Sequence, residues 1–261
     1  MGDILRQSSV VAAAAVTIAI NALANALPLN GQTTGAISDR FPVYFVPAGY
    51  VFSIWGLIYI GMIGFAIYQA LPSQREDPLL RRIGYPFVAS CVANVAWLFL
   101  WHYEQFVLTL VAMVALLVTL KIIYGRVQAA ADEFGSLHRW MVAVPFSIYL
   151  GWITVATIAN VSTVLYYLGW DGWGIAPQAW AVIMLASGGA IAARVSLPRA
   201  DAAYMLVILW AFAGIAVKQS AAPLVALTAV AVAVILGTLM VSRVSTRGGG
   251  RRLGSNTGLV R

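Results

Sequence analysis

The stretch VFSIWGLIYIGMIGFAIYQAL, residues 51–71, contains no charged side chain and decides the fold class of this chain. A helix needs roughly 20 mainly apolar residues to cross a bilayer. Seven other stretches have the same character, so we expect about eight transmembrane helices. The other seven are residues 8–27, 83–101, 106–124, 140–168, 179–197, 202–217 and 223–241, of which 202–217 is the shortest.

The composition supports an all-α integral membrane protein. Hydrophobic residues make up 61% of the 261 residues, charged residues 10%, and the mean hydropathy is +0.86. Soluble domains carry about 25% charged residues. Too few charged side chains are therefore present to cover a water-soluble surface, and the apolar residues must face lipid as well as each other.

The basic residues indicate the orientation in the membrane. If both termini are cytoplasmic, eight spans place every Lys and Arg in the cytoplasm except Arg40 and Lys218. This distribution follows the positive-inside rule. We therefore attribute the net charge of +7 to orientation and to membrane lipid, with no nucleic-acid partner. We expect both termini on the inner side of a bacterial cytoplasmic membrane, a basic disordered tail at 245–261, and an outer loop at 28–50 that acts as a lid.

Aromatic and amide side chains recur at helical spacing in three of the expected helices. Residues three, four or seven apart share one face of a helix. The three stripes are Phe52, Trp55 and Tyr59; Asn94, Trp97 and Trp101; and Tyr149, Trp152, Ala156 and Asn160. A buried Asn must be hydrogen-bonded, so Asn94 and Asn160 are expected to face the bundle interior. Such a surface suits a flat apolar ligand with a few polar atoms.

A structural role is the competing interpretation of the same residues. Tryptophan and tyrosine gather at membrane interfaces, and Asn often joins helices in membranes. Six aromatic residues near helix ends are expected in such an interfacial belt. They are Trp101, Tyr124, Tyr166, Tyr167, Trp170 and Trp173.

Catalytic chemistry has little support in the sequence. All nine Asp and Glu fall in expected loops, and no metal-ligand cluster or nucleophile with a base is visible. His102 and His138 lie at helix ends, and we expect His102 to be solvated rather than a haem ligand. No catalytic residue and no metal site are predicted.

Over residues 45–170 the chain resembles the TspO/MBR family, the tryptophan-rich sensory or translocator proteins. The stretch FVPAGYVFSIWGLIYIGMIGFAIY (45–68) is similar to the family's loop and second helix. ANVAWLFLW (93–101) resembles its Asn-x-x-Trp third helix, and VPFSIYLGWITVATIAN (144–160) its fifth. Two positions depart from the pattern, because Ala48 replaces a proline and Tyr50 replaces a tryptophan.

The resemblance implies a five-helix bundle that binds porphyrins, haem or other flat apolar ligands under an outer loop. It places a TspO-like unit at residues 1–173, three further helices at 174–244, and the tail at 245–261. The expected ligand-binding residues, from the stripes and the resemblance together, are Tyr50, Phe52, Trp55, Tyr59, Asn94, Trp97, Trp152, Ala156 and Asn160.

The expected function is a membrane receptor or carrier for a tetrapyrrole or a similar flat molecule, with a sensory or transport role. No cofactor is required, although a porphyrin or haem is an expected ligand. Two alternatives remain open at this point. One is an accessory subunit of a homo-oligomer or of a larger membrane complex, and the other is a protein that degrades a bound porphyrin.

Overall fold

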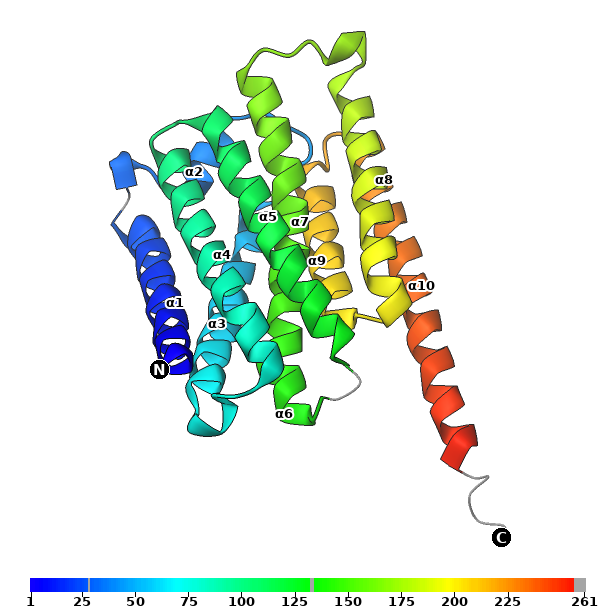
Figure 1. The fold of residues 1–261 in the computed structure, drawn as a ribbon. Coiled ribbons are helices and arrows are strands. Elements are labelled where there is room, and N and C mark those ends of the chain that lie inside the picture. Colours follow the sequence, from blue (N-terminus) through cyan, green and yellow to red (C-terminus); the bar gives the residue numbers. More distant parts are fainter. Residues whose placement is uncertain (28, 132–133, 256–261) are drawn as a thin grey trace.

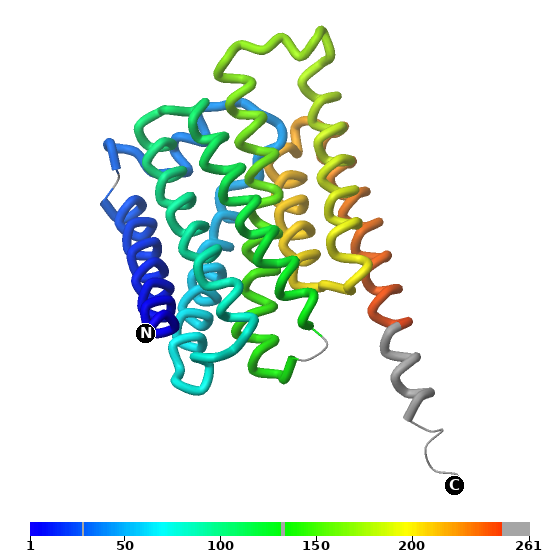
Figure 2. The backbone as a smooth tube through the Cα atoms, in the orientation of Figure 1, coloured from blue at the N-terminus to red at the C-terminus, as the bar shows by residue number. Residues whose placement is uncertain are grey.

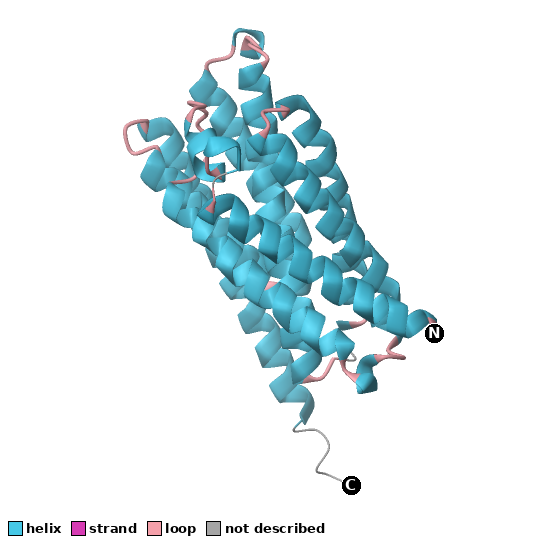
Figure 3. Ribbon diagram, turned by 90° about the vertical axis from the view of Figure 1, so that its left-hand side faces the viewer, coloured by secondary structure: helices cyan, strands magenta, loops and turns pink. Residues whose placement is uncertain are grey.

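The structure is a computed structural model that describes residues 1–27, 29–131 and 134–255. These residues form helices and loops without a strand (Figure 3), and the long helices pack into one bundle (Figure 1). The long helices are α1 (Gly2–Ala26), α3 (Ile54–Ala70), α4 (Pro78–His102), α5 (Phe106–Ala129), α7 (Val144–Tyr167), α8 (Pro177–Ser196), α9 (Ala202–Lys218) and α10 (Pro223–Ser255). The short helical segments are η1 (Leu29–Gly31), α2 (Thr34–Asp39), η2 (Gly49–Ser53), η3 (Pro72–Gln74), α6 (Ser136–His138), the π-helical η5 (Arg139–Ala143), η6 (Gly172–Gly174) and η7 (Leu197–Arg199).

The predicted all-α integral membrane fold is confirmed. Seven of the described helical segments are long and apolar enough to cross a membrane. The remaining predicted span, α9, has 17 residues. At 1.5 Å per residue it is about 26 Å long, somewhat less than the roughly 30 Å of a hydrocarbon core.

Helix α9 nevertheless reaches both ends of the bundle. At its start, the Asp201 carboxylate accepts hydrogen bonds from Tyr124 of α5 at 3.0 Å and from Ser147 of α7 at 2.7 Å. At its end, Lys218 forms a 2.9 Å ion pair with Asp39. The expected interfacial position of Tyr124 was wrong, because this side chain is only 5% exposed and is tied to Asp201.

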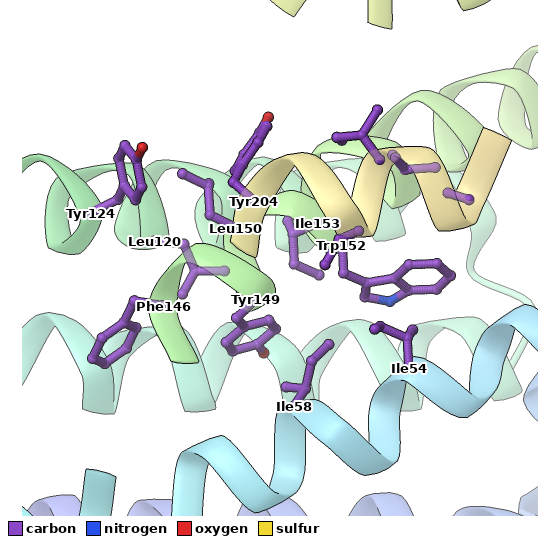
Figure 4. Close-up of a cluster of buried hydrophobic side chains, with 14 of the residues drawn as sticks. Ile54, Ile58, Leu120, Tyr124, Phe146, Tyr149, Leu150, Trp152, Ile153 and Tyr204 are labelled. Carbon is purple, nitrogen blue, oxygen red and sulfur yellow. The ribbon is translucent and has the colours of Figure 1, made fainter. Parts of the chain in front are cut away.

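One continuous apolar core joins the helices on both sides of residue 173. Figure 4 shows part of it, where Leu120 and Leu150 lie near Tyr204 of α9. The Tyr204 hydroxyl also donates a 2.9 Å hydrogen bond to Thr154 of α7. The division into a unit at 1–173 and three further helices at 174–244 stays a prediction, but α9 is packed directly against the helix that carries Trp152.

The C-terminal helix continues beyond the expected end of its span. Helix α10 is described as far as Ser255, so it enters the segment 245–261 that we expected to be a disordered tail. Residues 256–261 lie outside the described residues, as do Asp132 and Glu133, which we expected in a loop.

The two ends of the bundle differ in the segments they carry. The terminus face holds the start of α1, the end of α10 and the η3 and α6 segments. The loop face holds residues 29–53, 103–105, 168–176 and 219–222. In Figure 2, α1 begins at the lower end, toward which α10 runs, and the blue segment that follows α1 crosses the upper end. The protein is therefore a membrane-spanning bundle in which α1 begins and α10 ends at the same face.

Labelling of single cysteines is expected to separate the two faces. Cysteines introduced at Ser73 and Ser136 should react only from the cytoplasmic side, and those at Thr33 and Gln105 only from the other side, since the positive-inside rule orients the terminus face inward. The measurement is labelling of intact cells by a membrane-impermeant maleimide, in a background with buried Cys91 replaced by serine. Labelling of Ser73 and Thr33 variants from the same side would contradict this topology.

Candidate functional site

The close approach of α3 and α7 brings two predicted stripes together. An added Cβ at Gly61 of α3 would lie only 3.0 Å from the Pro145 Cβ of α7, so the two helices cross closely at this glycine. Further along the same pair of helices, the rings of Trp55 and Trp152 lie 6.3 Å apart at an interplanar angle of 80°. Trp152 also makes an edge contact with Phe52 at 5.7 Å.

These aromatic side chains line a cavity of about 60 Å³, which we call the tryptophan cavity. Helices α3, α4, α5 and α7 form its walls, and residues 29–53, which we call the lid, close it at the loop face. Its lining residues are Thr34, Ser38, Val46, Pro47, Phe52, Trp55, Asn94, Trp97, Trp101, Met113, Leu116, Trp152, Ile153, Val155, Ala156, Ala159, Asn160 and Thr163. No charged residue is among them, so the part of a ligand held here has to be uncharged.

Seven of the nine expected ligand-binding residues line this cavity: Phe52, Trp55, Asn94, Trp97, Trp152, Ala156 and Asn160. The other two lie outside it. Tyr50 is 48% exposed and contacts Trp210 of α9, while Tyr59 stacks on Trp55 at 5.7 Å. Their predicted role in binding would therefore have to be indirect, with Tyr59 supporting the Trp55 ring.

Both buried amides are satisfied by the protein itself. Asn160 accepts a 2.9 Å hydrogen bond from the Trp97 indole and donates one to Thr109 at 2.8 Å. Asn94 accepts from Asn21 at 2.8 Å and donates to the Tyr149 hydroxyl at 3.1 Å. The amides thus join four helices and hold the Trp97 ring at the cavity wall.

One polar group of the cavity has no partner among the described residues. Trp152 is 3% exposed, and its indole nitrogen is buried without a hydrogen-bond acceptor. Figure 4 shows the Trp152 ring beside Ile54 of α3. Leaving a buried donor unpaired costs about 1–3 kcal/mol. Trp152, a lining residue of the cavity, therefore carries a buried N–H that the described residues leave unpaired.

The interfacial position expected for Trp101 and the solvated position expected for His102 were wrong. Trp101 is 4% exposed, lines the cavity, and donates a 3.2 Å hydrogen bond to the Thr34 carbonyl. His102 is fully buried, with its two ring nitrogens 3.0 Å from the Thr34 hydroxyl and 3.1 Å from the Leu29 carbonyl. Both end α4 directly under the lid, which excludes the water that a helix end would otherwise meet.

The lid is also attached on its other side, to α9. The backbone N–H of Ala48 donates to the Gly214 carbonyl at 3.1 Å, and the Trp210 indole donates to the Val51 carbonyl at 3.2 Å. Two ion pairs tie the C-terminal end of α2: Arg40 to Glu104 at 2.8 Å and Asp39 to Lys218 at 2.9 Å. The lid is thus held by the α4–α5 corner and by one of the three C-terminal helices.

The described residues contain no group of three or more His, Cys, Asp or Glu side chains that could hold a metal ion. The arrangement instead offers an enclosed aromatic surface, one unpaired hydrogen-bond donor and a cover with several polar attachments. Such a site can bind, orient and release a molecule, and among the described residues its lining presents no acid or base.

Comparison with known proteins assigns the family. A comparison with curated proteins and another with solved structures each found no match. The family model described as TSPO-like protein matches residues 7–242, which include all eight predicted spans and end within α10. The three C-terminal helices, which we had placed outside the family pattern, thus fall within the match. The match covers most of the chain, and the chain belongs to the family of TSPO-like proteins.

Proposed function

We propose that this protein is a membrane receptor or carrier that binds a flat, largely apolar molecule, such as a tetrapyrrole, in the tryptophan cavity. The unpaired indole N–H of Trp152 is the observation that carries the proposal. A ligand with a carbonyl or another neutral acceptor at its edge would satisfy this donor while its ring lies against the indoles. A purely apolar ligand would leave the donor unpaired.

The size of the cavity supports a gated site. Drug-sized ligands occupy pockets of about 300–1,000 Å³, whereas the tryptophan cavity is about 60 Å³. A flat ligand of tetrapyrrole size therefore requires the lid or the wall side chains to move. The lid is the element suited to this, because residues 29–53 consist of short helical segments and loops rather than of a long helix.

Replacement of Trp152 by phenylalanine separates the hydrogen bond from the ring. We expect Trp152→Phe to weaken protoporphyrin binding about fivefold, because one hydrogen bond to the ligand is lost, with a net value of about 1 kcal/mol. The unliganded protein should be as stable as the parent or more so, since the variant no longer buries an unpaired donor. Quenching of tryptophan fluorescence in detergent gives the affinity, and thermal unfolding gives the stability.

The matched control is Trp140→Phe, because Trp140 is 64% exposed and lies far from the cavity lining. Trp140→Phe should change neither the affinity for protoporphyrin nor the thermal stability. If Trp152→Phe binds protoporphyrin as tightly as the parent, the ligand does not accept a hydrogen bond from the Trp152 indole. Failure of protoporphyrin and of smaller flat carbonyl compounds to bind the parent would favour the accessory-subunit alternative.

Loss of the Arg40–Glu104 ion pair is expected to loosen the lid. Glu104→Gln should speed both association and dissociation of protoporphyrin, because both require the lid to open. The effect should be at most about fivefold, since exposed ion pairs are worth about 0–1 kcal/mol. Stopped-flow fluorescence measures both rates, with Glu76→Gln at the terminus face as the control. A change in only one of the two rates would contradict a gating role.

The same ion pair predicts a pH dependence. The hydrogen bond from Arg40 holds the pKa of Glu104 below its ordinary value of 4.5. The pair is therefore fully present above pH 4.5 and is lost as the pH falls through the lowered pKa. Binding and release by the parent should accelerate below pH 4.5, and Glu104→Gln should lack this part of the acceleration.

A further inference from the structure

A second and larger cavity lies at the loop face, on the other side of α7. Its volume is about 300 Å³, and we call it the outer cleft. Adjacent residues of α7 line different cavities, since Ser162 faces the outer cleft and Thr163 the tryptophan cavity. The lining residues of the outer cleft are Pro42, Val43, Tyr44, Phe45, Ser162, Leu165, Tyr166, Trp170, Asp171, Gly172, Ile175, Pro177, Trp180, Ala181 and Met184.

Five aromatic side chains line the outer cleft: Tyr44, Phe45, Tyr166, Trp170 and Trp180. The rings of Trp170 and Trp180 lie 5.1 Å apart at 54° to each other, so they are set at different angles. The Trp180 N–H is already used, because it donates to the Gly172 carbonyl at 2.8 Å. What Trp180 offers to a ligand is therefore its π surface rather than a donor.

The only charged group that lines the outer cleft within the described chain is the Asp171 carboxylate. On the loop face, the two basic side chains Arg40 and Lys218 are both engaged by other acids, Glu104 and Asp39. Asp171 accepts a hydrogen bond from the Trp173 backbone N–H at 2.9 Å, and no described Lys or Arg forms an ion pair with it. An unneutralised negative charge thus stands at the wall of an aromatic cavity.

We propose that the outer cleft binds an organic cation of the quaternary ammonium class. Aromatic rings attract a cation over their faces, and quaternary ammonium groups are typically held in cages of Trp and Tyr. The carboxylate adds a long-range attraction and disfavours anions. This site is separate from the tryptophan cavity, whose lining carries no charge, and it uses α8, a helix that the proposed function does not need.

The cation can come from a choline-type lipid headgroup or from a free amphiphilic amine, because both present the same trimethylammonium group. The probe is choline, added to the full-length protein in nanodiscs that contain only phosphatidylglycerol and phosphatidylethanolamine. Saturation-transfer NMR on the methyl protons gives a dissociation constant. The neutral isostere 3,3-dimethylbutan-1-ol has the same shape without the charge, and we expect it to bind at least about tenfold more weakly.

Asp171→Asn should weaken choline binding about tenfold. Asparagine keeps an oxygen that can accept from the Trp173 N–H, so the turn is retained. The control is Glu76→Gln, which removes a carboxylate charge from the terminus face, outside the cleft, and should leave choline binding unchanged. Tyr166 is 52% exposed, so its replacement is tolerated by the fold. Tyr166→Leu should weaken binding several-fold, and Tyr166→Phe should restore most of it.

Phosphatidylcholine added to the nanodiscs distinguishes the two sources. A raised apparent dissociation constant for choline identifies a lipid headgroup as the competitor, and an unchanged constant identifies a free amine. Equal binding of choline and its neutral isostere, or an unchanged affinity in Asp171→Asn, would overturn the proposal. Protoporphyrin binding should be the same in Asp171→Asn and the parent. The choline proposal and the protoporphyrin proposal can therefore fail independently of each other.

Discussion

Trp152→Ala is expected to weaken protoporphyrin binding by at least about tenfold, and Trp55→Ala should have a similar effect. The two indoles lie 6.3 Å apart at the cavity wall. Each aromatic contact is worth about 0.5–1.5 kcal/mol beyond the area it buries, and 1.4 kcal/mol corresponds to a tenfold change. Removal of Trp152 also removes its apolar burial and its hydrogen bond to the ligand. Trp152→Ala should therefore lose more affinity than Trp55→Ala.

Stability must be measured beside affinity in these two variants. Trp152 is buried and contacts Phe52, so its truncation to alanine should cost about 3–5 kcal/mol of folding free energy. Trp55 is only partly buried, so its truncation to alanine should cost less folding free energy. Affinity is therefore compared at a temperature where each variant is folded by circular dichroism. Parent-like affinity in both folded variants would reduce these residues to packing roles and support the accessory-subunit alternative.

The sequence predicts the spans well because each is a long apolar run between polar segments. It predicts the walls of the tryptophan cavity in part, since the stripes on α3, α4 and α7 combine aromatic and amide residues with helical spacing. The sequence did not indicate that α5 forms a wall of the tryptophan cavity. Its residues Met113 and Leu116 line the cavity, but they lie in the run 110–118, in which every residue is apolar and no polar side chain distinguishes one face from another.

The lid shows why the remaining site residues could not be predicted from helical spacing. Trp101 and His102 occupy a helix end, where an interfacial position is the usual expectation. Their burial depends on a distant segment that folds over them, which is a tertiary effect. A local signal did exist for α2, because the Thr33 side chain accepts from the Ala36 N–H as a helix N-cap, and the pattern Thr-Thr-Gly-Ala at residues 33–36 is compatible with such a cap.

The sequence also did not indicate that α9 holds the lid. This helix carries no amide or acid in its interior, and its role comes from the position of Gly214. The lid crosses α9 at this point, where the Ala48 N–H donates to the Gly214 carbonyl. The absence of a side chain at Gly214 therefore allows a backbone from more than 160 positions earlier in the chain to lie against the helix.

Gly214→Ala is expected to lift the lid from α9. The added Cβ would lie 2.1 Å from the Val51 Cγ2 and 3.2 Å from the Pro47 Cβ. Overpacking of this kind costs about 1–3 kcal/mol, which exceeds the gain of up to about 1 kcal/mol from replacing glycine by alanine in a helix. The melting temperature should therefore fall. Protoporphyrin release should accelerate more than in Glu104→Gln, because a buried attachment is lost rather than an exposed ion pair.

Two further variants make this result specific to the lid. Gly237→Ala on α10 is the matched control, since its added Cβ would have only an ordinary 3.8 Å contact with Leu209. It should keep the parent's release rate and be at least as stable as the parent. Val51→Ala removes the methyl group that the new Cβ would strike. The double variant should therefore release protoporphyrin at nearly the rate of Val51→Ala alone. If Gly214→Ala leaves release unchanged in the parent background, the contact with α9 does not hold the lid closed, and gating must depend on the α4–α5 corner.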